Sequence, residues 1–487
     1  MFRLAILCLI ALLAYRISKV LRRLPVPPGP RGLPVFGSAL EIPKECSWLT
    51  FAQWAKTYGP IMHVSCMTSS IIVLSSREAI IDLLEKKNAV YSDRPIMTMA
   101  GELAGLKRLV AFAPYGQRHR EGRKLITGAL GPRKAPELHA IQEAKTLVFI
   151  SRLTESPAEF RTHIRWLVAS IVLEATYGIT IDSYDDPFLL EVEKSLAEIS
   201  DVSAPGAYLV DAIPSLKYVP EWFPAASFKR IARETRERSY ALEDKLYQAA
   251  RRQLDRGSAT PSFVADLLKH NYDPTQDDHT LYAEVAVMFY GAGADTTVSS
   301  ILSFFLIMAT HPDIQRKAQA EVDSVTSGRL PICSDREDMP YLGAVLKEVH
   351  RCNPVLPLAL PHYVREEDVY AGYRIPAGST ILPNTWAILH DPELYPHPDE
   401  VIPERYYDCS NGDLNPDPQD FAFGYGRRVC PGRTLAEDTL FIVAASVLAS
   451  FNITSVVPLK GETIEYRGGA ISHPDDFACG ILPRRST

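Results

Sequence analysis

Cysteine is scarce in this sequence, and the spacing of the few cysteines excludes several kinds of site. Only 8 cysteines occur among 487 residues, and no two of them form a C-x-x-C pair. This scatter argues against a structural zinc site and against a disulfide framework. It suits a reducing compartment, in which most thiols are simply buried.

Long basic runs are absent as well. The net charge is -6, and the Lys and Arg residues are spread along the chain, whereas a protein that tracks a nucleic-acid backbone gathers its positive charge. We therefore expect no nucleic-acid partner. No Gly/Ser linker, low-complexity tract or internal repeat follows the prolines near residue 30, so residues 36–487 are predicted to form one large domain.

The N-terminus is apolar without interruption over residues 4–15, and basic residues and prolines follow it. This run is shorter than the ~20 residues of a spanning helix, so residues 16–24 must extend it while basic side chains reach the headgroups. A cleaved signal peptide is the alternative, but no small-x-small cleavage site follows. We predict a membrane anchor over residues 1–24 and a Pro-rich hinge over residues 25–35. The positive charge after the anchor predicts a main domain on the cytoplasmic side.

Hydrophobic periodicity predicts a mainly α protein with small β-sheets. Helical patterns cover residues 77–87, 137–153, 228–254 and 314–325. Strand-like alternation is short: residues 61–65 and 71–75 suggest one hairpin, and residues 369–375 with 380–384 suggest another pair. Residues 205–224, rich in proline and aromatic residues, are predicted to be a loop that packs on the core or lines an access route to a pocket.

The segment Phe423-Gly424-Tyr425-Gly426-Arg427-Arg428-Val429-Cys430-Pro431-Gly432 carries the strongest chemical signal. A cysteine just before a helix gains from the helix N–H groups and from Arg428, which both favour the thiolate that binds iron. Gly426 and Gly432 let the backbone bend around the sulfur. A buried structural cysteine would explain Cys430 alone. The joint spacing, with Phe423 and Ala436, resembles the haem-binding loop of the cytochrome P450 family, which implies that Cys430 is the axial ligand of the haem iron.

Two further motifs are similar to segments of that family. In Glu348-Val349-His350-Arg351 the acid and the base share a helix face, and Pro403-Glu404-Arg405-Tyr406 supplies a second guanidinium. Any salt-bridged helix contains such a pair. The resemblance implies that Glu348, Arg351 and Arg405 form a buried structural cluster. Tyr406 departs from the family pattern, which more often has Phe or Trp at that place.

The segment Ala292-Gly293-Ala294-Asp295-Thr296-Thr297 places polar groups in an apolar stretch over residues 285–308. A dinucleotide-binding loop is excluded because Thr296 stands where glycine is required and no second strand ending in an acid follows. The segment is similar to the oxygen-binding kink of the P450 distal helix, which implies that Thr296 takes part in oxygen activation and that Asp295 relays protons from solvent. The alternative for Thr296 is a hydroxyl bonded back to its own helix.

The resemblance also gives several separated basic residues one purpose, because two buried haem propionates need positive partners. The matching positions are Arg94, His119, Arg123, His362 and Arg428. His119 stands where the family normally has Trp. Without the resemblance, each of these residues would be taken for a surface charge.

The likeness extends from Pro28 to the turn at residues 468–471 and implies the triangular-prism P450 fold, with haem b between Thr296 and Cys430. The implied reaction inserts one oxygen atom of dioxygen into a C–H or alkene bond of a lipophilic small molecule. No flavin or nicotinamide motif occurs, so electrons are expected from a separate NADPH-dependent reductase. A second possible class is a haem-thiolate isomerase or dehydratase that needs no external electrons, although such proteins typically lack the acid–Thr pair; a non-catalytic haem sensor is a third.

The closest likeness is to fungal microsomal members of secondary metabolism, including terpenoid and indole hydroxylases, which implies an endoplasmic reticulum membrane protein. It is carried by Trp48-Leu49-Thr50-Phe51, Pro214-Ser215-Leu216-Lys217-Tyr218 and Trp222-Phe223-Pro224. A basic cluster is expected either to bind an acidic flavodoxin-like reductase or to be a solvated helix face. Its members are Arg118, Arg120, Lys124, Arg133 and Lys134, with only Glu121 opposing them.

Overall fold

The computed structural model describes residues 24–33, 37–38, 40–43, 45–67, 69–131, 133–204, 206–270, 278–407, 414–468 and 471–484. All but one residue of the predicted anchor, and part of the turn at residues 468–471, lie outside the described residues, so the anchor stays a prediction. Within the described ranges, one helix, Thr280–Thr310, is long and apolar enough to cross a membrane, and it is mostly buried inside the protein.

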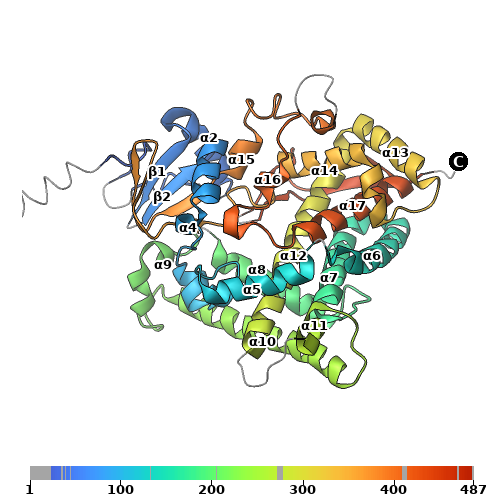
Figure 1. Ribbon diagram of the computed structural model, residues 1–487, viewed down its shortest axis with the longest axis horizontal. Coiled ribbons are helices and arrows are strands. Elements are labelled where there is room, and N and C mark those ends of the chain that lie inside the picture. Colours follow the sequence, from blue (N-terminus) through green and yellow to red (C-terminus); the bar gives the residue numbers. More distant parts are fainter. Residues whose placement is uncertain are drawn as a thin grey trace, which may run out of the picture.

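Helices dominate the molecule, as the sequence predicts (Figure 1). The longer ones are α2 (Ser47–Tyr58), α5 (Gln117–Leu130), α6 (Ala135–Glu155), α7 (Phe160–Tyr177), α8 (Pro187–Ser203), α10 (Ser227–Asp255), α12 (Asp278–Thr310), α13 (Pro312–Thr326), α14 (Pro340–Cys352) and α17 (Arg433–Ser450). Short helices are α3 (Arg77–Ile80), α4 (Asn88–Tyr91), α9 (Leu209–Ala212), α11 (Phe263–His270), α15 (Thr385–Leu389) and α16 (Gln419–Ala422). Buried residues of α12 share one hydrophobic core with those of α7 and α17, which explains the apolar sequence of α12.

The sheets are small. One has the strand order β1 (Ile61–Cys66), β2 (Ser69–Leu74), β6 (Thr380–Pro383), β3 (His362–Tyr363). The two-stranded sheets pair β4 (Asp368–Tyr370) with β5 (Tyr373–Ile375), β7 (Phe451–Pro458) with β10 (Phe477–Pro483), and β8 (Tyr466–Arg467) with β9 (His473–Pro474). The predicted β1–β2 hairpin is confirmed. The second predicted pair was wrong, because residues 368–375 form a hairpin by themselves and β6 instead pairs parallel with β2.

Two other local predictions hold only in part. Residues 77–87 do not form one α-helix: α3 continues as a π-helical segment, Ile81–Lys86. In the loop over residues 205–224, Val210 is buried in a core cluster against which Tyr208 and Leu216 pack, as predicted, but Tyr218 and Trp222 are 79% and 81% exposed. Neither of them lines the cavity that contains Cys430.

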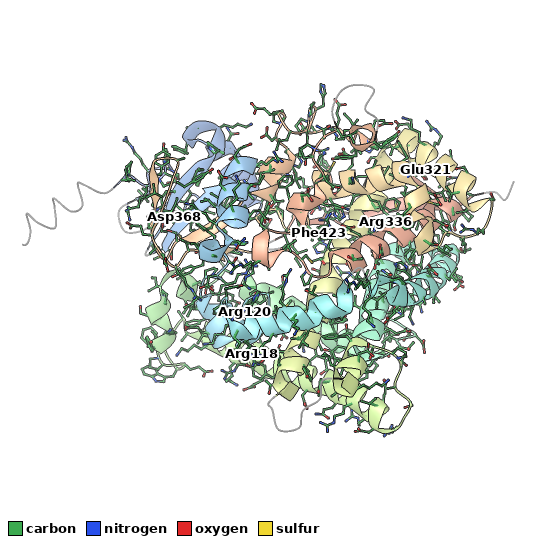
Figure 2. The ribbon with its side chains drawn as sticks, viewed as in Figure 1. Arg118, Arg120, Glu321, Arg336, Asp368 and Phe423 are labelled. Atoms are coloured by element: carbon green, nitrogen blue, oxygen red, sulfur yellow. The ribbon has the colours of Figure 1, made fainter. Side chains whose placement is uncertain are left out.

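Carboxylates of the helical body fix α14 and α17 in place. Glu321 on α13 accepts hydrogen bonds from the backbone N–H groups of Tyr341 and Leu342 at 2.9 and 2.8 Å, and so caps the first turn of α14. Arg336, which precedes α14, pairs with Glu437 and Asp438 of α17. Figure 2 labels Glu321 and Arg336 beside these helices. The start of α17, directly after Cys430, is therefore tied to α13 and α14.

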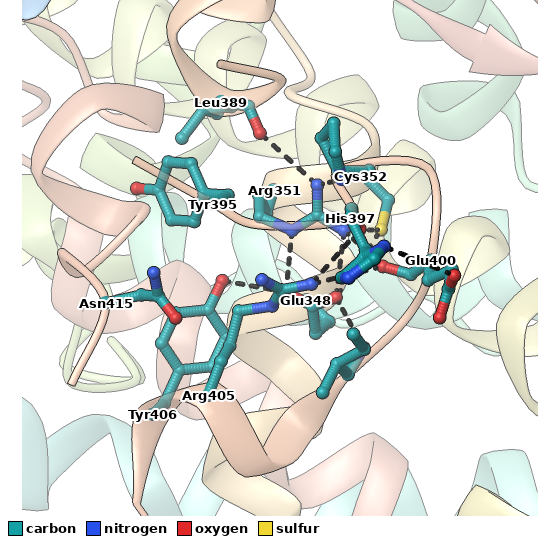
Figure 3. A network of polar contacts seen from close by, with 12 residues as sticks. Glu348, Arg351, Cys352, Leu389, Tyr395, His397, Glu400, Arg405, Tyr406 and Asn415 are labelled. Carbon is teal, nitrogen blue, oxygen red and sulfur yellow. Dashed lines mark hydrogen bonds and ion pairs between the residues drawn. The ribbon is translucent and has the colours of Figure 1, made fainter. Parts of the chain in front are cut away.

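Glu348 is the centre of the buried cluster that the sequence predicts (Figure 3). Its Oε1 accepts hydrogen bonds from Arg351 Nε and from the Tyr406 hydroxyl, both at 2.7 Å, and Arg405 Nε lies 3.3 Å from the same oxygen. Its Oε2 accepts from Arg351 Nη2 at 2.9 Å and from the backbone N–H of Ile402 at 2.9 Å. The tyrosine that departs from the family pattern thus has a defined role, because its hydroxyl donates to Glu348.

The cluster also holds a loop by its backbone. Arg351 donates to the carbonyl oxygens of Pro398 and Glu400 at 2.6 and 2.8 Å, and Arg405 donates to that of Pro396 at 2.8 Å. Glu348 and Arg351 are fully buried. The buried carboxylate of Glu348 holds the two guanidinium groups, and these in turn fix the backbone of residues 396–402.

We predict that Glu348→Gln destabilises the protein by about 3–5 kcal/mol, because it leaves two buried guanidinium groups without their carboxylate. Tyr406→Phe is the matched control, since it removes one hydrogen bond to the same carboxylate and should cost about 1.5–3 kcal/mol. Urea unfolding followed by circular dichroism measures both. Equal unfolding midpoints for the two variants and the wild type would contradict the role of the cluster.

Candidate active site

A central cavity of about 250 Å³ brings together most of the predicted site residues. Its walls come from α5, α7, α12 and α17, from the loop after α14, and from the loop before α17. The predicted site residues on its walls are Arg94, His119, Arg123, Thr296, His362, Phe423, Arg428 and Cys430. Gly426 is not on the cavity wall, and neither is Asp295.

The loop before α17 places Cys430 at the cavity. The backbone N–H of Cys430 donates to the Phe423 carbonyl oxygen at 2.7 Å, which closes the loop. Gly426 has a φ of +53°, and a Cβ there would lie 2.2 Å from the Leu84 carbonyl oxygen. The predicted need for glycine is therefore confirmed at Gly426. It was wrong at Gly432, whose φ of -92° suits any residue.

The electrostatic prediction for Cys430 holds for the helix N–H group, which favours the thiolate, and was wrong for Arg428. Cys430 is exposed to the cavity, but desolvation by the surrounding protein raises the pKa of its thiol, and the Gly432 N–H with the charges of Arg123 and Arg433 offsets this only in part. Arg428, the expected source of positive charge, instead donates to the carbonyl oxygens of Ser92, Val110 and Ala113. A metal ion deprotonates a coordinating thiol outright, so iron itself would hold this sulfur as a thiolate.

Positive charge gathers on one wall of the cavity without acidic partners. Within the described residues, none of Arg94, His119, Arg123, His362 and Arg428 forms an ion pair with a carboxylate. Asp93, whose charge acts on Arg94 and Arg428, is engaged by Arg365 and by the backbone N–H of Tyr115. Nδ1 of His119 is buried without a hydrogen-bond partner.

Burial and mutual repulsion lower the pKa values on this wall. The pKa of His119 falls to about 3, through burial and then through the charges of Arg428 and Arg123. That of His362 also falls to about 3, through burial and then Arg94, and burial lowers the pKa of Arg428 to about 10. Such a wall fits a group with two negative charges. These residues therefore fit the two propionates of haem, with Cys430 on the same cavity as the iron ligand.

In the structure, the Thr296 hydroxyl on α12 makes the alternative contact that the sequence left open, a hydrogen bond to its own helix. Thr296 Oγ1 donates to the Ala292 carbonyl oxygen at 2.7 Å, a bond within its own helix, although the residue lines the central cavity. The predicted part of Thr296 in oxygen activation stays a prediction.

Asp295 points elsewhere and has two basic partners. His473 Nε2 lies 3.0 Å from Asp295 Oδ2, and Arg165 Nη1 lies 3.9 Å from Asp295 Oδ1. Burial alone raises the pKa of the carboxyl group, but the hydrogen bond from His473 and the charges of His473 and Arg165 hold it below its ordinary value. Sequence reasoning missed both partners, because His473 is 178 residues away from Asp295 and belongs to no motif.

His350 is a further residue that sequence reasoning missed, although it stands inside the motif around Glu348. It lines the central cavity, its ring lies edge-on to that of Phe423 with centroids 5.2 Å apart, and its buried Nε2 has no hydrogen-bond partner. Burial lowers the pKa of His350 to about 4. Its position within the motif was the only available signal.

The predicted basic cluster on α5 and in the segment after it is smaller than expected. Arg118 Nη2 pairs with Glu284 at 2.6 Å, and Lys134 pairs with Glu137 at 2.7 Å, so Glu121 is not the only opposing acid. Arg120, Lys124 and Arg133 remain, with Arg123 and Arg427, around a groove of about 690 Å³ beside the central cavity. Figure 2 labels Arg118 and Arg120 on α5.

A helical body in which a cysteine and a polar segment of a core helix share one cationic cavity is the arrangement of haem-thiolate enzymes, and comparison with known proteins agrees. Residues 27–477 match the family model for cytochrome P450, and the chain belongs to that family. It is 39% identical over 477 residues to cytochrome P450 monooxygenase claR of Ampulloclitocybe clavipes, with 96% of this chain and 88% of the relative covered. It is 40% identical over 470 residues to cytochrome P450 monooxygenase ple1 of Rhodocybe pseudopiperita, with 94% and 90% covered.

The protein is thus a haem-thiolate monooxygenase, an oxidoreductase whose fungal relatives bear the same description. Family membership implies haem and a separate redox partner that supplies electrons. The isomerase or dehydratase and the non-catalytic sensor, which the sequence left open, are not retained. The roles of individual site residues stay predictions.

We predict that Cys430→Ala abolishes thiolate ligation, because no other cysteine of the described residues lines the central cavity. Haem content should fall, and the reduced carbon-monoxide complex should lose its thiolate-type Soret band. The matched control is Cys352→Ala, which removes a thiol outside the cavity and should keep the band. Retention of that band in Cys430→Ala would contradict the assignment.

Proposed function

We propose that this protein uses NADPH-derived electrons and dioxygen to hydroxylate or epoxidise a neutral lipophilic small molecule of fungal secondary metabolism, with a terpenoid as the first candidate and an indole compound as the second. The observation that carries the proposal is that Cys430 and Thr296 share one cavity whose remaining walls are largely apolar.

The walls of the cavity favour an uncharged substrate. Apolar side chains line it on the side of α5, α7 and α12, among them Ile126, Val168, Val172, Met288 and Phe289. Within the described residues, no carboxylate or lysine lines it, and the basic side chains that do are those that fit the haem propionates, together with His350, whose pKa falls to about 4. A charged substrate would lose its hydration there without a compensating partner.

Each site residue has a defined task in this proposal. Thiolate-ligated haem, when bound, supplies cleavage of the O–O bond. Cys430 holds the iron, and the cationic wall holds the propionates. Thr296 stands on the cavity wall and would hold a proton or a water molecule at its Oγ1 by giving up its bond to Ala292. Asp295, one residue away on a different face of α12, would bring protons from solvent.

Product formation from a terpenoid panel tests the proposal. Microsomes that contain the chain and a reductase are supplied with NADPH and ¹⁸O-labelled dioxygen, and products are identified by mass spectrometry. One labelled oxygen atom per product, absent without NADPH and absent in Cys430→Ala, supports the proposal. Products that form equally without NADPH would contradict the monooxygenase reaction, and a panel without any product would contradict the terpenoid class.

We further propose that the partner is NADPH–cytochrome P450 reductase, that it docks on the groove around Lys124 and Arg133, and that residues 1–24 anchor the protein in the endoplasmic reticulum membrane. The groove supports the docking site because it opens beside His119 and Arg123, which also line the central cavity. An acidic partner there would stand near the haem. The hinge over residues 25–35 would keep the main domain at the cytoplasmic surface.

We predict that Thr296→Ala lowers the product formed per NADPH oxidised several-fold and releases more hydrogen peroxide, because protons are no longer directed from the cavity wall. Thr296→Ser keeps the hydroxyl and should restore the ratio. Thr310→Ala is the matched control, since Thr310 makes the same bond within α12, to Leu306 at 2.8 Å, and lies outside the cavity lining. An unchanged ratio in Thr296→Ala would leave this residue a packing role only.

We predict that the charge reversal Lys124→Glu with Arg133→Glu slows reduction by the reductase at least about tenfold at low salt, through lost electrostatic steering. The difference should shrink as salt rises above ~0.1 M, where charges are screened beyond ~10 Å. The control is the charge reversal Arg230→Glu on α10, where the side chain of Arg230 is 63% exposed. Stopped-flow reduction rates decide, and equal rates at low salt would exclude the groove as the docking site.

A further inference from the structure

The carboxylate of Asp295 connects the distal helix to solvent on the side away from the cavity. The next residue, Thr296, lines the central cavity, whereas Asp295 itself reaches His473 of β9 and Arg165 of α7. The side chains of Asp295 and His473 are 34% and 24% exposed. The pair therefore stands where water can reach it, one residue from the cavity wall.

The contact with His473 is fixed by the backbone around it. The Ser299 hydroxyl of α12 donates to the Ser472 carbonyl oxygen at 2.5 Å, and the Ser472 N–H donates to the Val355 carbonyl oxygen at 2.8 Å. The Ser472 hydroxyl in turn donates to Asn353 Oδ1 at 3.2 Å. Ser472 is fully buried, so the residue directly before His473 is locked to α12 and to the loop after α14. The contact between Asp295 and His473 is therefore part of the packed structure and not a chance meeting of two surface side chains.

Among the basic groups around Asp295, only His473 is of a residue type suited to proton transfer. Asp295 faces Arg165 from α7 and His473 from β9. Beside His473 on β8, Arg467 is paired with Glu465 and Asp475, and further along α7, Arg161 is paired with Asp476. Arginine stays charged at all relevant pH values, whereas histidine is the side chain type that gains and loses a proton between about pH 5 and 8.

We propose that His473 is the positioning residue of Asp295 and passes it protons from solvent, so that His473 sets the pH dependence of oxygen activation in this protein. This inference rests on the proposed role of Asp295 in proton delivery. The imidazolium Nε2–H gives its proton to Asp295 Oδ2, and the neutral imidazole takes a proton from solvent. The neutral carboxyl group is no longer attracted to Arg165, turns toward the side of Thr296, and releases the proton there as it regains its charge.

The decisive variant is His473→Gln, which keeps an N–H donor for Asp295 but cannot titrate. We expect normal haem content and stability, a loss of the wild-type pH dependence of NADPH oxidation, and a larger solvent deuterium isotope effect. His311→Gln, at the end of α12, is the matched control and should keep the wild-type profile. A wild-type pH profile and isotope effect in His473→Gln would overturn the inference.

Asp295→Asn separates this inference from the proposed function. General acid–base catalysis typically contributes about 10²–10⁴-fold, so this variant should slow turnover at least about tenfold if Asp295 delivers protons. Slow turnover in Asp295→Asn with an unaltered pH profile in His473→Gln would overturn the role of His473 alone. Unchanged turnover in Asp295→Asn would overturn the relay itself.

Thermal unfolding gives a readout that does not depend on activity. Because the folded-state pKa of Asp295 is lowered, its ionised form stabilises the fold above the ordinary Asp pKa of ~3.9, and this stabilisation is lost as the pH falls through the folded value. The melting temperature of the wild type should exceed that of Asp295→Asn at neutral pH and approach it in acid. Equal melting temperatures at neutral pH would contradict a stabilising contact between Asp295 and His473.

Discussion

The structure depends on a wall of positive charge that the protein itself does not neutralise. Among the described residues, Arg94, Arg123 and Arg428 line one cavity without acidic partners, beside two histidines whose pKa values of about 3 leave them neutral. The guanidinium groups of Arg94 and Arg428 are held by backbone carbonyl oxygens, which fix their position but supply no negative charge. A fold that buries such a wall gains stability from a bound dianion. Folding and the binding of such a group are therefore linked, and the carbonyl contacts fix the positions of these two guanidinium groups.

The local motifs could be predicted because each is held together over a few residues. Cys430 bonds to Phe423 within one loop, and Glu348 bonds to Arg351 one helical turn away. The sequence also contains the physical reason for each, namely glycine at a left-handed turn and an acid–base pair on one helix face. For the same reason the mainly helical class and the hairpin over residues 61–74 followed from periodicity alone.

The contacts that the sequence did not predict join distant segments through ordinary residues. His473 meets Asp295, and Glu284 meets Arg118, only because β9 and α5 pack against different faces of α12. No periodicity specifies such packing. The π-helical segment Ile81–Lys86 and the parallel pairing of β6 with β2 are tertiary choices of the same kind. The helix N–H that favours the Cys430 thiolate was predicted from the sequence, whereas the opposing desolvation depends on packing and was not.

The helix α12 brings two environments within one residue of each other. Thr296 belongs to the apolar cavity and Asp295 to a polar surface cluster, since neighbouring residues on a helix point about 100° apart. The face of Asp295 also carries Ser299, which fastens the segment before β9. One helix therefore separates the apolar cavity from a solvent-accessible polar cluster, and the C-terminal strand β9 forms part of that polar cluster.

The tight approach of Gly426 to the Leu84 carbonyl oxygen bears on the order in which the chain matures. The Gly426 N–H also donates to Glu85 Oε1 at 2.7 Å, across 341 residues of sequence. The loop of Cys430 therefore takes its final shape only against a segment that the ribosome released long before. Because the chain is synthesised from the N-terminus, residues 81–86 cannot make this contact until the segment around Gly426 has been synthesised. The cavity that contains Cys430 can therefore be completed only after the segment around Gly426 has been synthesised.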